Sequence, residues 1–201
     1  MTLVRDKAML IGIVIGLILF MAGLICLVLL GGASSQPLPA DPALSLINSS
    51  AGKTAGRADS KTKVSGIPVR IEIPSVGINL KVVPGYYNAQ TELWTLSLND
   101  AQFAQISAPA NNEGGLTFIY GHYRSGVFMN LHLVTPGASA KLVTDNRHIF
   151  SYVFRRSITT VPQDTSFLSY EGKPIMVVQT CSGPHFENRQ LFVFDFSEVK
   201  A

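Results

Sequence analysis

Cys181 is the residue whose type and position most directly indicate covalent chemistry. It follows the apolar run from Pro174 to Thr180 and precedes Ser182-Gly183-Pro184, which is typical of a turn. A cysteine at the end of a strand lies at an edge of a sheet, where a substrate can reach it. Its thiolate can attack a carbonyl carbon and form a thioester, which divides a difficult amide exchange into two easier steps. A buried cysteine that only ends a strand is the alternative interpretation.

The chain holds one other cysteine, Cys26, inside a long apolar run near the N-terminus. We expect Cys26 to be an apolar filler, so Cys181 has no disulfide partner on its own side of that run. A single thiol in an exported domain indicates an intermolecular disulfide, a tolerated buried thiol or a nucleophile. Two cysteines also exclude a disulfide-dense scaffold and a structural zinc site built from paired Cys-x-x-Cys motifs.

A nucleophilic cysteine needs a basic or cationic neighbour, because a free thiol with a pKa of about 8.5 is mostly protonated near pH 7. Four histidines are available. His122 comes directly after an apolar, β-prone run, so it too lies at the end of a predicted strand. His132 is expected to pack or to lie on the surface, and His148 is expected to be solvated in a turn. His185, in the loop after Cys181, stays open as a candidate.

Arg189 is the third candidate residue, eight positions after Cys181 and at the start of the last strong strand. Because strands joined by a short loop are usually neighbours, both residues are expected at the same end of the sheet. A guanidinium stays charged and donates in a fixed fork, so it could stabilise the oxyanion of an acyl-transfer intermediate. A surface ion pair, for instance with Glu187, is the alternative interpretation.

The elements that must position these residues are mostly strands. The strand over 78–83 is expected to end at Pro84-Gly85, and Asp145-Asn146-Arg147 is expected to turn a hairpin. Many short strands with few helices predict a mostly β fold, a barrel or a sandwich. Apolar alternation and short β-prone runs predict strands over 69–73, 78–83, 116–120, 140–144, 149–154, 174–180 and 191–196. Short helices are expected within 96–106, 125–133 and 163–170.

Residues 8–30 form an uncharged apolar run of about 23 residues, roughly 35 Å long as a helix, enough to cross a ~30 Å hydrocarbon core. Arg5 and Lys7 precede the run and the next basic residue is Lys53, so residues 1–7 are expected in the cytoplasm. We expect a single-pass protein of the cell membrane with its folded part outside. A cleaved signal peptide is the alternative, although its apolar segment is ordinarily shorter.

The segment 31–63 is rich in Ser, Ala, Gly and Pro, which predicts a flexible extracellular stalk before a folded domain over 64–201. Charged residues make up 14% of the chain, and the formal net charge is +3. Lysines and arginines are scattered, with no run longer than Arg155-Arg156, which argues against a nucleic-acid partner. Glu113, Asp145 and Asp164 are isolated and form no calcium loop. We therefore expect no metal and no cofactor.

The candidate residues, in this order and spacing, resemble the sortases, the membrane-anchored cysteine transpeptidases of Gram-positive cell envelopes. The segment from Arg70 to Ile78 (RIEIPSVGI) is also sortase-like, and the resemblance spans about residues 67–199. Many sortases have Thr-Leu-x-Thr-Cys where this chain has Val177-Val178-Gln179-Thr180-Cys181, so the subclass is left unassigned. The motifs that carry the resemblance are Tyr120-Gly121-His122, Val127-Phe128 with Leu131, Pro136-Gly137, Thr180-Cys181 and Arg189.

The resemblance implies a sortase-like eight-stranded β-barrel with a few short helices, preceded here by one N-terminal transmembrane helix. It implies Cys181 as nucleophile, His122 as general acid and base, and Arg189 as the donor that positions substrate and stabilises the oxyanion. The implied substrates are surface proteins or pilins with a sorting signal of the Leu-Pro-x-Thr-Gly kind, cleaved between Thr and Gly through a thioacyl enzyme. The implied acceptor is an amino group of a lipid-linked peptidoglycan precursor or of a pilin lysine.

Three alternatives stay open. A non-catalytic, membrane-tethered β-domain that binds envelope proteins would have the same chain apart from the three candidate residues. A cysteine transpeptidase that cross-links peptidoglycan stems would carry Ser-x-Gly-Cys and an arginine two positions later, whereas Thr180 precedes this cysteine and Pro184 stands nearby. A zinc hydrolase using His122, His185 and Cys181 would lack a ligand pair on one element.

Overall fold

The structure is a computed structural model that describes Ile47 and residues 62–201, except 89 and 92. The predicted cytoplasmic segment 1–7, the predicted membrane segment 8–30 and nearly all of the predicted stalk 31–63 lie outside the described residues. Within the described residues, no helix has the length and apolar character needed to cross a membrane.

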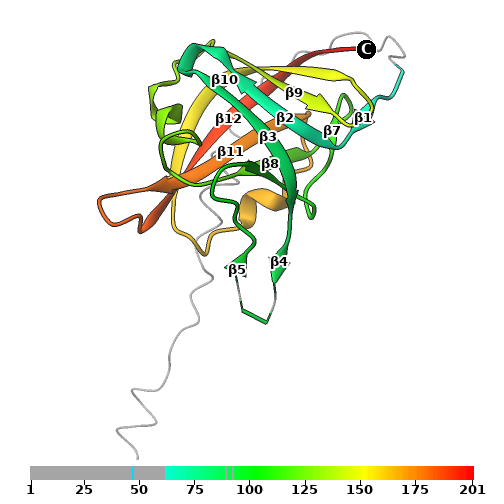
Figure 1. Ribbon diagram of the computed structural model, residues 1–201. Coiled ribbons are helices and arrows are strands. Elements are labelled where there is room, and N and C mark those ends of the chain that lie inside the picture. The colour runs from blue at the N-terminus through cyan, green and yellow to red at the C-terminus, as the bar shows by residue number, and fades with distance from the viewer. Residues whose placement is uncertain (1–46, 48–61, 89, 92) are drawn as a thin grey trace, which may run out of the picture. The chain divides into compact units, whose positions relative to one another are not determined.

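Eight strands close into a barrel in the described part of the chain (Figure 1). The order around the barrel is β10, β12, β11, β8, β6, β3, β2, β9 and back to β10. Most neighbours are antiparallel, but β8 with β11 and β3 with β6 are parallel. The predicted eight-stranded, mostly β fold is therefore confirmed. The strands are β2 Pro68–Ile73, β3 Ile78–Gly85, β6 Ala101–Ala104, β8 Leu116–Tyr120, β9 Ser139–Thr144, β10 Ile149–Thr160, β11 Ile175–Ser182 and β12 Asn188–Lys200.

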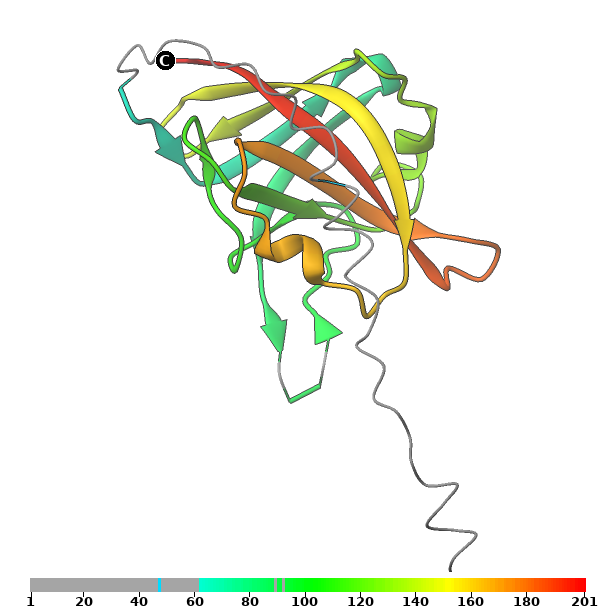
Figure 2. The same ribbon diagram turned by 180° about the vertical axis from the view of Figure 1, so that it is seen from behind.

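Short elements connect and flank the barrel strands. Two small pairs lie outside the barrel: β1 (Ser65–Gly66) with β7 (Ala110–Asn111), and β4 (Tyr87–Asn88) with β5 (Leu93–Trp94). The β4–β5 hairpin and the β11–β12 loop both project from the barrel in two opposite views (Figures 1 and 2). Three short 3-10 helices are described, η1 Pro74–Val76, η2 Met129–Leu133 and η3 Ser166–Ser169.

Side chains of β11 and β12 alternate between two apolar clusters, as strand geometry requires. Val178 and Phe192 face the barrel core, to which all eight barrel strands contribute. Val177 and Leu191 face the opposite way, into a second group that we call the outer cluster. Burying each of these side chains contributes about 1.5–3 kcal/mol, so both faces of this part of the sheet are strongly specified. The outer cluster is Ile47, Ala104, Leu116, Phe118, Tyr120, Ile158, Phe167, Tyr170, Ile175, Val177, Leu191 and Val193.

Ile47 connects the predicted stalk to the outer cluster. Its side chain is 1% exposed, and its backbone carbonyl accepts a hydrogen bond from Arg155 Nη2 at 3.3 Å. Phe167 of η3 also covers the outer cluster, and its ring packs edge-on against Phe118 of β8, with centroids 5.0 Å apart. The outer face of β8, β11 and β12 is thus covered by Ile47, which precedes all three strands in the sequence, and by η3, which lies between β10 and β11.

Two local predictions were wrong. The segment 96–106 was expected to hold a short helix but contains strand β6, whose four residues are all buried. Burial between β3 and β8 overrides the helical preference of its alanines. The strand expected to end at Pro84-Gly85 continues through both residues and pairs with β6. Proline is tolerated there because β3 pairs with β2 only as far as Lys81, which leaves that edge free of ladder bonds.

The remaining element predictions hold, with adjusted lengths. All seven predicted strands are present, and β10 and β12 run well beyond their predicted ends. The predicted hairpin turn joins β9 to β10, where Arg147 has a φ of 69°. The segments 125–133 and 163–170 hold only the 3-10 helices η2 and η3.

Candidate active site

The register of three neighbouring strands brings the sequence-predicted residues together. Cys181 of β11 pairs directly with Arg189 of β12 in the antiparallel ladder. β11 also runs parallel to β8, and the last pair of that ladder is Gln179 with Tyr120. Residues that follow β8 therefore lie beside the end of β11, where Cys181 stands.

Two hydrogen bonds extend the β8–β11 contact to the residue before His122. The Gly121 amide donates to the Gln179 carbonyl at 3.1 Å, and the buried Thr180 hydroxyl donates to the Gly121 carbonyl at 3.0 Å. The His122 backbone is thereby held next to the end of β11. His122, Cys181 and Arg189 are each half-buried, so they are accessible to a ligand from the barrel end.

Close packing explains the glycine before His122. A Cβ on Gly121 would lie 2.9 Å from the Phe128 ring and 3.2 Å from Val127. The His122 carbonyl in turn accepts a hydrogen bond from the Phe128 amide at 3.2 Å. Val127 and Phe128 are buried in the barrel core, so the core anchors the loop that carries His122.

Arg189 braces the loop between β11 and β12. Its Nη1 donates to the carbonyls of Phe186, at 3.1 Å, and Asn188, at 3.0 Å. Among the described residues it forms no ion pair with Glu187, whose carboxylate accepts the His185 amide at 2.9 Å. The surface ion pair considered from the sequence is therefore not formed. The guanidinium stays at the end of the strand pair and keeps donors for a further partner.

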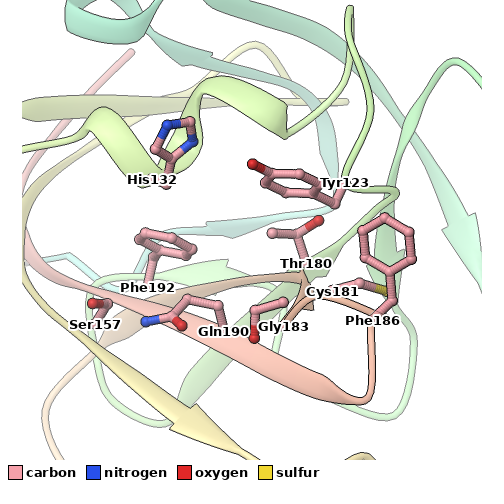
Figure 3. A pocket seen from close by; sticks show the side chains of 10 residues that line it. Tyr123, His132, Ser157, Thr180, Cys181, Gly183, Phe186, Gln190 and Phe192 are labelled. Atoms are coloured by element: carbon pink, nitrogen blue, oxygen red, sulfur yellow. The ribbon is translucent and has the colours of Figure 1, made fainter.

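A pocket of about 390 Å³ opens beside Cys181 at this end of the barrel (Figure 3). In the close-up, His132 and Tyr123 lie on one side of it, and Gln190, Phe192 and Ser157 lie on the other. Sequence analysis singled out none of these as functional, since they come from separate elements with no shared motif. The pocket is lined by Tyr123, His132, Ser157, Thr180, Cys181, Ser182, Gly183, Phe186, Gln190 and Phe192.

The opposite face of β8 and β11 is apolar and uncharged. Tyr120, at the end of β8, packs its ring edge-on against Trp94 at 5.3 Å. Its hydroxyl donates to the Thr95 carbonyl at 2.9 Å. Burial raises the pKa of Tyr120 above its ordinary value, against a smaller lowering effect from Thr95. The phenol is therefore neutral at physiological pH.

The remaining histidines do not join the three candidate residues at a metal site. Within the described residues, no three His, Cys, Asp or Glu side chains gather closely enough to hold a metal ion. The zinc-hydrolase alternative for His122, His185 and Cys181 thus finds no support in the described residues. His185 lies exposed in the β11–β12 loop, and His148 lies in the hairpin between β9 and β10.

Comparisons with known proteins agree with this geometry. The model of the sortase domain family matches residues 71–195, which include all three candidate residues and most of the barrel. No sequence among curated proteins matches this chain.

Solved structures of sortases share the fold at low sequence identity. Sortase C2 of Group B Streptococcus pilus island 1 has 16% identity and a TM-score of 0.54, over 64% of this chain and 73% of that one. Sortase C-3 of Streptococcus pneumoniae has 21% identity and a TM-score of 0.54, over 68% of this chain and 65% of its own, slightly under two thirds. Listeria monocytogenes sortase A has 18% identity and a TM-score of 0.53, over 68% of this chain and 90% of that one.

Proposed function

Because this chain belongs to the sortase family, we propose that it cleaves a sorting signal of the Leu-Pro-x-Thr-Gly kind and joins the cleaved protein to an amino group. The acyl donor would be a surface protein or a pilin, and the acceptor a lipid-linked peptidoglycan precursor or a pilin lysine. The domain would act outside the cell, tethered to the membrane through residues 8–30. No metal or cofactor takes part in the proposed reaction.

The reaction would begin with attack of the Cys181 sulfur on the carbonyl carbon of the threonine in the signal. A carbon–sulfur bond forms, and the peptide nitrogen leaves as an amine after His122 gives it a proton. His122 would then take a proton from the incoming amine as that amine replaces the sulfur. Thiol and imidazole need no permanent charge, since a minority thiolate–imidazolium pair suffices for turnover.

Arg189 would stabilise the negative oxygen that forms in each step. A guanidinium is a cation that donates in a fixed geometry, which suits it to a developing oxyanion. The two carbonyls of the β11–β12 loop engage only Nη1. The other guanidinium nitrogens are thus suited to receive the oxyanion beside the paired Cys181.

The donor peptide would reach Cys181 through the pocket that opens beside it. The outer face of β8 and β11 is covered by Ile47 and by Phe167 of η3, so it offers no open surface next to Cys181. The rings of Phe186 and Phe192 line the pocket. An apolar residue of the signal, such as its leucine, suits that lining.

One observation carries the proposal: Cys181 pairs with Arg189 across one ladder, while Gly121 and Thr180 hold His122 beside it across the other. A non-catalytic binding domain has no need for a thiol, an imidazole and a guanidinium at one strand end. The peptidoglycan cross-linking alternative gains nothing here, because its arginine would stand two positions after the cysteine, where this chain has Gly183.

The test uses the full chain in detergent micelles with a fluorogenic Leu-Pro-x-Thr-Gly peptide. We expect cleavage, a thioester adduct on the peptide that contains Cys181 by mass spectrometry, and complete loss of both in Cys181→Ala. Cys26→Ala is the matched control and is expected to retain both. Cleavage that survives Cys181→Ala, or a wild-type chain that never forms the adduct, would refute the proposed chemistry.

A further inference from the structure

We propose that the β4–β5 hairpin docks onto the outer surface of the membrane, with its exposed apolar side chains at the level of the lipid headgroups. The inference rests on one part of the proposed function, the membrane tether through residues 8–30. It adds a second contact with the bilayer, which orients the catalytic domain, and it makes no use of the chemistry at Cys181.

The hairpin and the residues that follow it expose a group of large apolar side chains. Leu93 is 66% exposed and Leu98 is 62% exposed. The sequence over 86–98 holds a single charged residue, Glu92. A group of apolar side chains left in water on a projecting element marks an interaction site. We call this group the hairpin patch, and its members are Tyr86, Tyr87, Leu93, Leu96 and Leu98.

The residue types of the hairpin patch suit a membrane interface. Tyrosine and tryptophan join an apolar ring to a polar group, so they gather where hydrocarbon meets water. Tyr87 pairs with Trp94 across the two strands, with ring centroids 5.5 Å apart. The leucines supply apolar area for the acyl-chain boundary. One acidic residue in this stretch suits docking at headgroup depth rather than deep insertion.

Hydrogen bonds within the hairpin lower the cost of bringing its backbone to lipid. The Thr95 amide donates to the Tyr86 carbonyl at 2.9 Å, and the Tyr86 amide donates to the Thr95 hydroxyl at 3.0 Å. Near the tip, the side-chain oxygen of Asn88 accepts from the amides of Gln90, at 2.9 Å, and Thr91, at 3.2 Å. Unpaired backbone groups are costly beside hydrocarbon, and these groups have partners.

The place of Ile47 identifies the membrane as the surface that the hairpin patch meets. Ile47 is buried in the outer cluster, so only residues 31–46 separate the predicted membrane segment from the barrel. These residues span at most about 55 Å when fully extended, roughly half of what the whole of 31–63 would allow. The side of the barrel that carries the outer cluster is therefore kept near the bilayer.

The hairpin belongs to that same side of the barrel. Trp94 packs against the outer cluster, with its ring centroid 6.3 Å from that of Phe118 and 5.3 Å from that of Tyr120. The hairpin and the β11–β12 loop project in different directions in both views (Figures 1 and 2). A membrane in contact with the hairpin would thus leave the end of β11, with Cys181, uncovered.

The experiment uses Trp94 as its own reporter, because it is the only tryptophan in the sequence. The full chain is reconstituted into vesicles of phosphatidylcholine, or of the same lipid with bromine atoms on the acyl chains close to the headgroup. Bromine quenches tryptophan emission on close approach. We expect Trp94 emission to be about twofold or more lower in the brominated vesicles, as for a ring at the membrane interface.

The double variant Leu93→Asp with Leu98→Asp tests the hairpin patch itself. Two added carboxylates oppose contact with lipid, so we expect its Trp94 emission in brominated vesicles to return to the value in unbrominated vesicles. Both side chains are exposed, and the variant is expected to fold. Cleavage of the fluorogenic Leu-Pro-x-Thr-Gly peptide in detergent micelles at the wild-type rate checks this.

Leu133 provides the matched controls. It is 59% exposed on η2. The Asn130 side chain of η2 donates to the Val76 carbonyl at 3.3 Å, and Val76 precedes β3 whereas the hairpin follows it, so η2 lies at the other end of β3. We expect Leu133→Asp to keep the quenching of Trp94. In a chain with Trp94→Phe and Leu133→Trp, we expect brominated lipid to leave the emission unchanged.

Equal Trp94 emission in the two kinds of vesicle overturns the proposal and leaves the hairpin patch to a protein partner or a second copy of the chain. Quenching that survives Leu93→Asp with Leu98→Asp, or that is equal for Leu133→Trp, overturns it as well. A chain that does not float with the vesicles overturns the tether and the docking together.

Formation of the Cys181 thioester is measured in the same vesicles to separate the two proposals. A normal thioester without quenching overturns the docking alone. Quenching without a thioester supports the docking and overturns the proposed chemistry.

Discussion

Thr180→Val tests whether one buried hydroxyl aligns His122 with Cys181. The Thr180 side chain is 3% exposed, and its hydroxyl donates to the Gly121 carbonyl at 3.0 Å. Valine keeps the shape of threonine but removes the donor, so the Gly121 carbonyl is left buried without this partner. Losing one partner of a buried hydrogen bond costs about 1–3 kcal/mol, which lowers the melting temperature by roughly 3–10 °C in a domain of this size.

The catalytic effect is expected to exceed what stability alone explains. The bond ties the residue before Cys181 to the residue before His122, so its loss loosens the spacing of the sulfur and the imidazole. Misplacement of reacting groups by about 1 Å can cost on the order of a hundredfold in rate, and we expect at least a tenfold fall in the rate of thioester formation. The assay is single-turnover acylation by a Leu-Pro-x-Thr-Gly peptide at a temperature where the variant is fully folded.

Thr117→Val is the matched control. Thr117 is 2% exposed, and its hydroxyl donates to the Pro109 carbonyl at 3.1 Å, away from the candidate residues. We expect a similar loss of stability and a wild-type acylation rate. If Thr180→Val loses stability but acylates as fast as Thr117→Val, the hydroxyl only stabilises the fold and the alignment argument fails.

Three further predictions concern the site and the fold. Arg189→Ala is expected to slow acylation about a hundredfold or more, which corresponds to about 3 kcal/mol in the activation barrier. Equal acylation rates for Arg189→Ala and wild type in single-turnover assays would show that Arg189 does not stabilise the oxyanion. Gly183 has a φ of 90° and a Cβ there would lie 2.5 Å from the Glu187 carboxylate, so Gly183→Ala should cost about 1–2 kcal/mol in urea unfolding. Gly126→Ala shares the positive φ without the contact, and any extra loss in Gly183→Ala reports the crowding. Burial raises the pKa of Tyr152, so as the pH rises the unfolded chain loses the phenolic proton before the folded chain does. The free energy of unfolding should therefore fall above pH about 10 by up to about 1.4 kcal/mol per pH unit. Tyr152→Phe should lack this part of the pH dependence in urea unfolding measured at several pH values.

Most strands of the barrel were predictable from the sequence because the apolar residues that mark them are the residues that the fold buries. Alternation over 69–73 and the apolar runs over 116–120 and 174–180 correspond to β2, β8 and β11. The short strand β6 was not predictable, since Ala-Gln-Phe-Ala has no β-prone pattern and becomes a strand only through pairing with β3 and β8. Tertiary context decides such segments more than intrinsic preference does.

One part of the candidate site was also predictable from the sequence, and another part was not. Cys181, His122 and Arg189 could be singled out because each directly follows or begins a strong strand, and strand ends meet at one edge of a sheet. The pocket could not be foreseen, since His132, Ser157 and Gln190 belong to three separate elements that only barrel closure brings together. The burial of Ile47 in the outer cluster could not be foreseen either, because its neighbours in the sequence carry no periodic apolar pattern.

The parallel pairing of β8 with β11 is what allows the three candidate residues to meet. In a parallel pair, both strands end at the same edge, so a residue just after β8 and a residue at the end of β11 become neighbours. The antiparallel neighbour β12 starts at that edge, and its first residues therefore include the partner of Cys181. Had β8 run antiparallel to β11, His122 would lie at the far end of the strand, about five residues or roughly 17 Å away. The crossover that makes this pair parallel, through η2, β9, β10 and η3, also places His132 and Ser157 around the pocket beside Cys181, so one topological choice positions both the candidate residues and the pocket.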